Sequence, residues 1–211
     1  MKLWIVFIII LIHNLQASEL DPFKVSLESE HQVTLLNYGL GALEARLQMI
    51  EKAQKTIDVE YYIYNLDKSG RIISQALIKK AHEGVKVRML LDYFTAKTQF
   101  SPFFAYEMEK NGIEVRYYNV ISIFNLSKAQ YRNHRKVLLI DGEEVIIGGR
   151  NIGDEYFDLR EDFNFLDLDL LISGKIVSYI TDPFHIIWNA PVTKKIKRPD
   201  APLITDAIYR P

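Results

Sequence analysis

Apolar residues along the chain switch between helical and strand spacing. Between residues 40 and 53 they recur at three- and four-residue intervals with charged residues between them, which predicts an amphipathic helix. The next stretch, residues 56–64 (TIDVEYYIY), is rich in β-branched and aromatic side chains and predicts a strand. The same criteria predict helices over residues 72–83 and 102–111, and strands over residues 85–91 and 113–118.

The pattern continues with a hairpin, a strand and a helix. The hairpin spans residues 134–147, where two apolar runs are joined by an Asp-Gly turn dipeptide. A further strand is predicted over residues 163–172, followed by a helix over residues 176–188 that is interrupted near Pro183. Helices that alternate with strands in this way predict a layered α/β domain with a mostly parallel central sheet.

Segments of different character flank the predicted domain, which covers residues 40–188. A short apolar run followed by small residues predicts a secretory signal peptide over residues 1–18, because a transmembrane span needs about 20 apolar residues. A buried N-terminal strand is the alternative. Residues 19–39 are predicted to form an irregular connection. Residues 189–211, with four prolines and a basic run, are predicted to be a tail or a truncated linker.

Composition narrows the possible functions. With 211 residues, of which 48% are hydrophobic, the chain is long enough to form one well-buried core. The formal net charge of -1 gives no general attraction for a polyanion such as DNA. The chain has no cysteine, which excludes disulfides, thiolate metal sites and cysteine nucleophiles.

The segment HRKVLLIDGEEVIIGGRN carries the candidate chemistry. On a strand, His134 and Lys136 would point to the same face. Gly148 and Gly149 allow a ligand to approach main-chain N–H groups, and Asn151 adds an amide donor. This set is suited to nucleophilic displacement at phosphorus without a metal or other cofactor. For an isolated His-x-Lys pair, the alternative is a surface histidine beside solvated basic residues.

The full spacing, H-x-K, four residues, D, six residues, G-G-x-N, resembles the signature of the phospholipase D superfamily. The segments IDVEYYIY, GVKVRMLLDY, GGRNIGDEYFD and FLDLDLLISG are similar to bacterial cardiolipin synthases and related phospholipase D-like proteins. The resemblance implies an α-β-α sandwich and a reaction in which the motif histidine becomes a phosphohistidine while the lysine and the asparagine bind phosphate. The motif residues here are His134, Lys136, Asp141, Gly148, Gly149 and Asn151.

Three positions need a separate interpretation. Asp141 completes the family motif, but its position at the turn indicates a structural role in fixing the hairpin. Gly149 stands where many family members have serine, so the site loses a hydroxyl and keeps the backbone N–H. Asp167 occupies the place of an acidic residue that orients the active-site histidine in the family. The alternative is that Asp167 and Asp169 face water on a half-solvated strand.

Other residues near the motif are assigned structural or nonspecific roles. Tyr61, Tyr62 and Tyr64 are interpreted as strand packing. Asp92 either lines the pocket at the end of a strand or caps the following helix. Three basic residues provide positive charge that suits any phosphodiester, namely Lys128, Arg132 and Arg135.

The chain carries a single motif, because His13, His31, His82 and His185 are not followed by lysine two positions later. A two-step phosphodiester reaction needs a nucleophile on one side of phosphorus and a proton donor on the other. Two hypotheses follow: a homodimer with two facing motifs, or the first half of a two-motif enzyme. The proline-rich tail favours the second.

A phospholipid substrate at a membrane surface, with water or an alcohol as acceptor, fits the cardiolipin synthase-like segments. It also fits predicted export to the periplasm or the medium. A nonspecific homodimeric endonuclease of the same superfamily is an alternative, although near-neutral charge weighs against nucleic-acid binding. An inactive fragment or interaction module is the third hypothesis.

Overall fold

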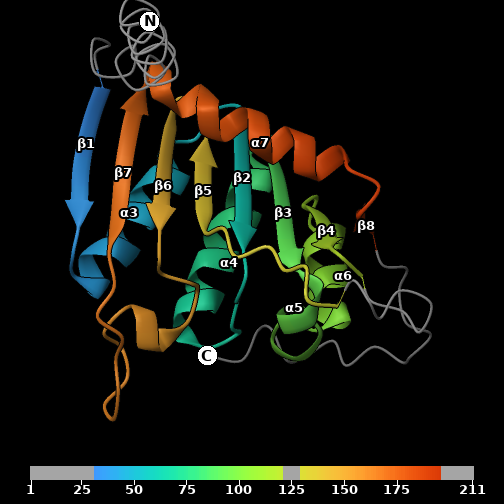
Figure 1. Ribbon diagram of the computed structural model, residues 1–211, viewed down its shortest axis with the longest axis horizontal. Coiled ribbons are helices and arrows are strands. Elements are labelled where there is room, and N and C mark those ends of the chain that lie inside the picture. The colour runs from blue at the N-terminus through green and yellow to red at the C-terminus, as the bar shows by residue number, and fades with distance from the viewer. Residues whose placement is uncertain (1–30, 121–128, 196–211) are drawn as a thin grey trace, which may run out of the picture.

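The computed structural model describes residues 31–120 and 129–195, which form one eight-stranded sheet with helices on both faces (Figure 1). The strands lie in the order β1, β7, β6, β5, β2, β3, β4, β8. Their bounds are β1 His31–Leu36, β2 Thr56–Tyr61, β3 Lys86–Asp92, β4 Glu114–Tyr118, β5 Val137–Ile140, β6 Glu144–Gly148, β7 Asp169–Gly174 and β8 Thr193–Lys194. The predicted signal peptide, most of the predicted tail and Lys128 lie outside the described residues.

The sheet is mixed, which corrects the prediction of a mostly parallel sheet. β2, β3 and β4 run parallel to one another, whereas the other neighbouring strands pair antiparallel. Parallel neighbours need a crossover connection, and helices over residues 68–82 and over residues 93–99 and 102–110 supply it between β2 and β3 and between β3 and β4. The layered α/β fold itself is confirmed.

The helices form two layers around this sheet. In Figure 1, α3 and α4 lie behind the sheet and α7 crosses its opposite face. Polar side chains define several helix starts, since Asp67, Asp92 and Ser101 accept backbone N–H bonds at the N-termini of α4, α5 and α6. The helix bounds are α3 Gly39–Lys52, α4 Lys68–His82, α5 Tyr93–Gln99, α6 Pro102–Lys110 and α7 Ser178–Asn189, with 3₁₀ turns η2 Asp154–Tyr156 and η3 Lys175–Val177.

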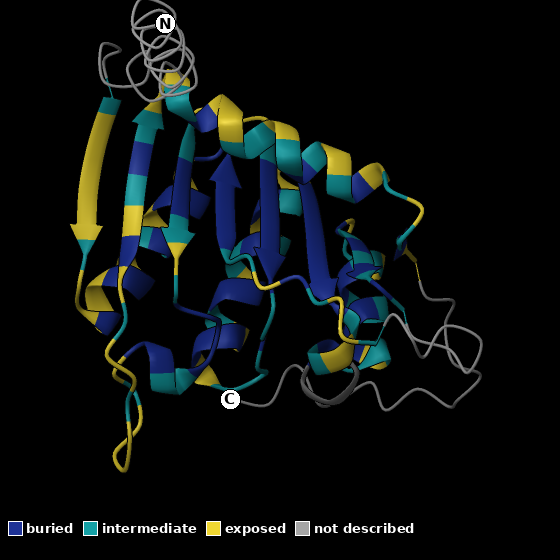
Figure 2. Ribbon diagram, viewed as in Figure 1, coloured by how far each residue is buried: buried dark blue, intermediate teal, exposed yellow. Residues whose placement is uncertain are grey.

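The two faces of the sheet are buried in different ways. On the α3 and α4 side, one large apolar cluster includes Ile57 and Val59 of β2. Under α7 the apolar clusters are smaller, and β2 contributes Asp58 and Glu60 to this face. The central strands are nonetheless buried, as Figure 2 shows. Buried carboxylates on this face must therefore be satisfied by partners within the fold.

Asp58 finds such a partner in Arg88 of β3. The guanidinium donates to both carboxylate oxygens at 2.6 Å, and it also lies 5.1 Å from the Phe184 ring centroid and 5.5 Å from that of Trp188. Burial raises the pKa of Asp58, and the ion pair with Arg88 opposes this shift. The pair thus fastens α7 to the middle of the sheet.

The structure differs locally from the predicted elements: α5 was not predicted, and β8 lies in the segment predicted to be a tail. β1 corrects the prediction of an irregular connection over residues 19–39; it is an edge strand with four consecutive exposed residues. β7 begins at Asp169, so the predicted strand over residues 163–168 is an irregular arm that projects from the body in Figure 1. α7 continues through Pro183 without interruption. Within the described residues, no helix is both long and apolar enough to cross a membrane.

A buried charge cluster joins the edge of the sheet to α3. Asp169 accepts from Arg46 Nη2 at 2.9 Å and lies 3.5 Å from Arg150 Nη1. Arg150 also donates to the carbonyls of Leu36 and Asn37, after β1. Both arginines and Asp169 are almost fully buried. The cluster connects α3, β7, the end of β1 and the segment that follows β6.

We expect Asp169→Asn to lower the free energy of unfolding by about 3–5 kcal/mol, because two arginines would keep buried charges without a counterion. Urea denaturation followed by circular dichroism measures the loss. The control is Glu143→Gln, which removes the partner of Lys55 from a pair whose side chains are 70% and 71% exposed. That variant should unfold at the wild-type urea concentration. Equal losses in the two variants would contradict this account of the buried cluster.

Candidate functional site

His134 and Lys136 lie in an extended segment just before β5, not within the strand as predicted. The structure nevertheless brings them together on one aromatic ring. The His134 imidazole is exposed and stacks on Tyr62, with ring centroids 4.0 Å apart and planes inclined by 19°. Lys136 Nζ lies 5.6 Å from the same ring centroid and donates to the His134 carbonyl at 2.6 Å. Tyr62 therefore contacts both side chains of the His-x-Lys pair.

Buried carboxylates hold the residues on either side of His134. Glu60, which is fully buried, accepts from Asn133 Nδ2 at 2.6 Å and lies 3.3 Å from Arg135 Nη1. Asp92 accepts from the Asn133 backbone N–H at 3.0 Å. The main chain around His134 is thus tied to β2 and to the end of β3.

Asp92 also has a local role. Its Oδ1 accepts from the backbone N–H of Phe94 and from Arg132 Nη1, at 2.9 and 3.0 Å. Of the two sequence interpretations, the structure shows the helix cap, and it adds the contact with the segment before His134. The positive charge of Arg132 and Arg135 is consequently paired with buried carboxylates.

Burial changes the protonation behaviour of two groups near the motif. Desolvation raises the pKa of Glu60, against the opposing effects of Arg135 and Asn133. Desolvation also lowers the pKa of Lys136, and the nearby Asp167 carboxylate opposes that shift. Asp167 is therefore close enough to influence Lys136.

Gly148 and Gly149 lie in close contact with the residues that lead into β7. A Cβ atom on Gly148 would lie 2.2 Å from Asp169 Oδ1 and 2.4 Å from the Leu168 carbonyl oxygen. On Gly149 it would lie 2.0 Å from Asp167 Oδ1. The glycines thus allow the chain that returns from the projecting arm to approach their backbone.

Asn151 links the glycine segment to the continuation of β2. Its Oδ1 accepts from the Ile63 N–H at 3.0 Å, and its Nδ2 donates to the Tyr156 hydroxyl at 3.0 Å. The side chain is buried, and the next residue, Ile152, forms a bridge with Tyr64. The amide therefore joins the backbone of Ile63 to the Tyr156 side chain, and its predicted phosphate contact remains a prediction.

Asp167 lies over Gly149, and its Oδ1 accepts from the Leu168 N–H at 2.7 Å. Within the described ranges, no hydrogen bond joins it to His134. Its predicted role in orienting the histidine remains a prediction. Asp169, the alternative solvent-facing residue, is instead buried in the arginine cluster described above.

Asp141 occupies the turn after β5, at the opposite end of that strand from Lys136. Its φ is 55°, and its carboxylate accepts from three consecutive backbone N–H groups, those of Gln54, Lys55 and Thr56. Partial burial would raise the pKa of Asp141, but these bonds outweigh it and hold the pKa below its ordinary value. These three hydrogen bonds join the turn of the hairpin to the start of β2.

Sequence reasoning missed two residues of the site, Glu60 and Tyr62. Tyr61 and Tyr64 are packing residues as predicted, with 2% and 1% exposure, but Tyr62 is partly exposed and stacks on His134. A signal was present in the sequence. Glu60 is an acidic residue inside an otherwise aromatic and apolar strand, and Tyr62 follows it at the two-residue spacing of one strand face.

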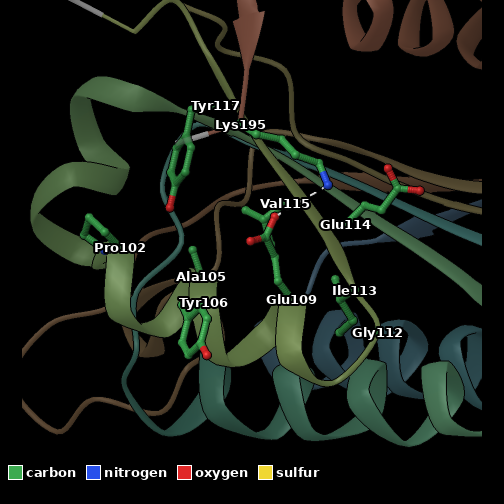
Figure 3. Close-up of a pocket in the computed structure, with 10 residues that line it drawn as sticks. All are labelled: Pro102, Ala105, Tyr106, Glu109, Gly112, Ile113, Glu114, Val115, Tyr117 and Lys195. Carbon is green, nitrogen blue, oxygen red and sulfur yellow. Dashed lines mark ion pairs between the residues drawn. The ribbon is translucent and has the colours of Figure 1, made fainter. Parts of the chain in front are cut away.

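A separate pocket of about 510 Å³ lies between α6 and β4 and contains no motif residue. Figure 3 shows Tyr117 and Lys195 among its lining side chains, with Lys195 paired to Glu109. Burial raises the pKa of Tyr117. Among the described residues, no group of three or more acidic or histidine side chains could hold a metal ion.

Comparison with known proteins identifies the family. The family described as "Cardiolipin synthase, PLD-like domain" matches residues 47–188. The chain belongs to this phospholipase D-like family. The family match includes Glu60, Tyr62 and all the motif residues described above.

Curated relatives include cardiolipin synthases. The chain is 36% identical over 162 residues to the major cardiolipin synthase ClsA of Bacillus subtilis, covering 76% of this chain and 33% of that protein. It is also 36% identical over 162 residues to cardiolipin synthase C of Escherichia coli, covering 72% and 34% of the two chains. The chain therefore spans about a third of the length of these relatives.

Solved structures support the fold. NucT from Helicobacter pylori is similar with a TM-score of 0.57 and 18% identity, over 76% of this chain and 96% of that one. Nuc from Salmonella typhimurium, a phospholipase D family member, is similar with a TM-score of 0.56 and 19% identity, over 77% and 95%. The mixed sheet between helices is thus shared with phospholipase D family structures.

The hydrogen bonds to Asp141 predict how the stability of the fold depends on pH. Because the folded-state pKa is lowered, the carboxylate stabilises the fold above its ordinary pKa, and this contribution is lost as pH falls through the lowered value. Asp141→Asn should cost about 1 kcal/mol near pH 7, as for the loss of a capping side chain. Urea titrations from pH 7 to pH 2 should show the difference from wild type shrinking below pH 4. A constant difference would contradict this assignment.

The two glycines should respond differently to an added methyl group. Gly148→Ala would meet the backbone of Leu168 and Asp169, and we expect a loss of about 1–3 kcal/mol. Gly149→Ala meets only the partly exposed carboxylate of Asp167, which can rotate away, so the loss should be much smaller. Thermal unfolding of both variants measures the contrast. The reverse order would show that the packing described here is wrong.

Proposed function

We propose that the chain supplies one catalytic half-site of a phospholipase D-type phosphodiesterase or phosphatidyltransferase that acts on phospholipids. The observation that carries the proposal is the pairing of exposed His134 with Lys136 on the Tyr62 ring, in a cardiolipin synthase-like domain. Similarity to cardiolipin synthases supports a phospholipid substrate.

The chemistry proceeds in two steps. An imidazole nitrogen of His134 attacks phosphorus, a P–N bond forms, and the bond from phosphorus to the departing alcohol oxygen breaks. That oxygen takes a proton as it leaves. Water or an alcohol then loses a proton and attacks the phosphohistidine, which releases the product and frees His134. Lys136 and Asn151 stabilise charge on the non-bridging oxygens, whereas the Gly149 N–H donates to the Leu168 carbonyl.

The departing oxygen needs an acid on the side of phosphorus opposite His134. The single motif leaves two sources for it: a second copy of the chain, or a second motif in a longer protein. The chain matches 95% of the Nuc chain but about a third of the length of the cardiolipin synthases. Proteins similar to this chain thus include both a short chain and longer ones, which correspond in length to the two arrangements. We favour the longer, two-motif arrangement, because sequence identity is higher to the cardiolipin synthases.

Location is a second part of the proposal. The apolar N-terminal run supports export to the periplasm or the medium, where the site would meet lipid at a membrane surface. Fractionation of cells that produce the full chain tests this. Recovery in the cytoplasm with an intact N-terminus would contradict export.

The reaction is tested with phosphatidylglycerol carrying ³²P in its phosphodiester and, in parallel, with plasmid DNA. In an assembly that holds both half-sites, we expect lipid turnover and an acid-labile, base-stable phosphoenzyme, both lowered on the order of a thousandfold or more in His134→Ala. His82→Ala is the matched control, because His82 is also exposed but lies at the end of α4.

Activity that survives His134→Ala would refute the nucleophile. Cleavage of plasmid without lipid turnover would favour the endonuclease. Cross-linking and gel filtration of the same samples identify the source of the second half-site. A strictly monomeric and inactive chain would contradict the homodimer and leave the two-motif arrangement.

A further inference from the structure

The direction of the His134 side chain is set by its two neighbours. Asn133 is buried, with 8% exposure, and the Arg135 side chain is 27% exposed, whereas His134 between them faces solvent. Both neighbours turn toward the same buried group, Glu60 of β2. The imidazole therefore projects outward because the residues before and after it are held inward.

Glu60 and its partners form a closed set of contacts. Asn133 donates to Glu60 Oε1 at 2.6 Å, and Arg135 Nη1 lies 3.3 Å from Glu60 Oε2. The third contact of this set joins the two partners of Glu60 to each other: Asn133 Oδ1 accepts from the Arg135 backbone N–H at 3.2 Å. A fully buried carboxylate with these two partners fixes the backbone on both sides of His134.

The same stretch of chain supplies the surface on which the imidazole rests. Tyr62 follows Glu60 by two residues and stacks on His134 at 4.0 Å. Glu60 pairs with Val137 across the β2 and β5 register, three residues after His134. Glu60 of β2 therefore holds the backbone around the histidine, and Tyr62, just beyond the end of β2, stacks on its ring.

We propose that Glu60 is a positioning residue of this site: it holds Asn133 and Arg135 so that the His134 imidazole projects onto Tyr62 in the orientation needed for attack. The assignment rests on the proposed function. It adds a residue outside the His-x-Lys motif that acts through the backbone and does not touch the substrate.

β2 offers a matched control for this role. Asp58 lies two residues before Glu60 on the same face, is also buried and is also paired with an arginine. Its partner Arg88 packs against α7 and not against the segment around His134. Asp58→Asn therefore removes an equivalent buried charge without changing the neighbours of His134.

The test uses nuclear magnetic resonance of the full chain with ¹³C-labelled histidine, with His134→Ala to assign the signal. Stacking on Tyr62 displaces the His134 ring protons upfield, and Tyr62→Ala supplies the unstacked reference. We expect Glu60→Gln to lose more than half of this displacement and to speed hydrogen exchange of the Arg135 amide. Asp58→Asn should keep both at wild-type values. If Glu60→Gln does not fold, Arg135→Gln releases the same segment from the partly exposed side.

In turnover assays, Glu60→Gln should lower kcat about ten- to hundredfold with KM little changed, because misplacement affects the transition state more than binding. Asp58→Asn should keep the wild-type kcat per folded molecule. Wild-type ring shifts in Glu60→Gln would overturn the proposal whether or not the protein turns over lipid. Lost displacement in Glu60→Gln supports the positioning role even if the wild-type chain shows no turnover, a result that would contradict only the homodimeric form of the proposed function.

Discussion

A buried carboxylate needs a partner inside the protein, and in β2 this requirement organises the site. Glu60 meets it with the two neighbours of His134. Directly beyond it, Tyr62 receives the imidazole and the Ile63 N–H donates to Asn151. Two motif segments that lie more than ten residues apart thus converge on four consecutive residues, 60–63, at the end of β2 and just beyond it. The geometry of the motif depends on β2 as much as on the motif itself.

The hairpin that carries the motif is fixed to β2 at both ends. At one end, Asp141 accepts the N–H groups of three residues leading into the strand. At the other, Asn151 accepts the N–H of Ile63 beyond the strand. The ladder between β2 and β5 lies between these contacts. Side-chain contacts of this kind limit sliding of the hairpin, which would displace Lys136 and the glycines together.

How much of the fold could be predicted depended on the type of signal in the sequence. Periodicity identified the helices near α3, α4 and α6 because each buries one face against the sheet. It failed for β1, an edge strand whose exposed residues do not alternate, and for residues 163–168, where alternation continues in an arm that does not pair. Strand direction also lay beyond the pattern, because alternation does not record which strands pair.

The site was predictable where chemistry and spacing coincide. His134, Lys136 and the two glycines could be read from the sequence because their residue types are unusual at those intervals. Glu60 could not be assigned, since its partners come from 73 residues away and only the folded register brings them into contact. The burial of Asp169 was hidden for the same reason. Its arginine partner Arg46 lies 123 residues earlier in the chain.

The lengths of the strands and the turn in the hairpin explain the intervals between the motif residues. The four residues between Lys136 and Asp141 are the whole of β5, and the six before Gly148 are the turn and the first residues of β6. Since each strand residue advances the chain by about 3.3 Å, the number of residues between motif positions is set by the lengths of the strands that lie between them. One inserted residue in β5 would leave every motif residue present and turn half of them to the wrong face. The spacing is therefore a record of strand length, and a relative with altered spacing must have rebuilt this hairpin.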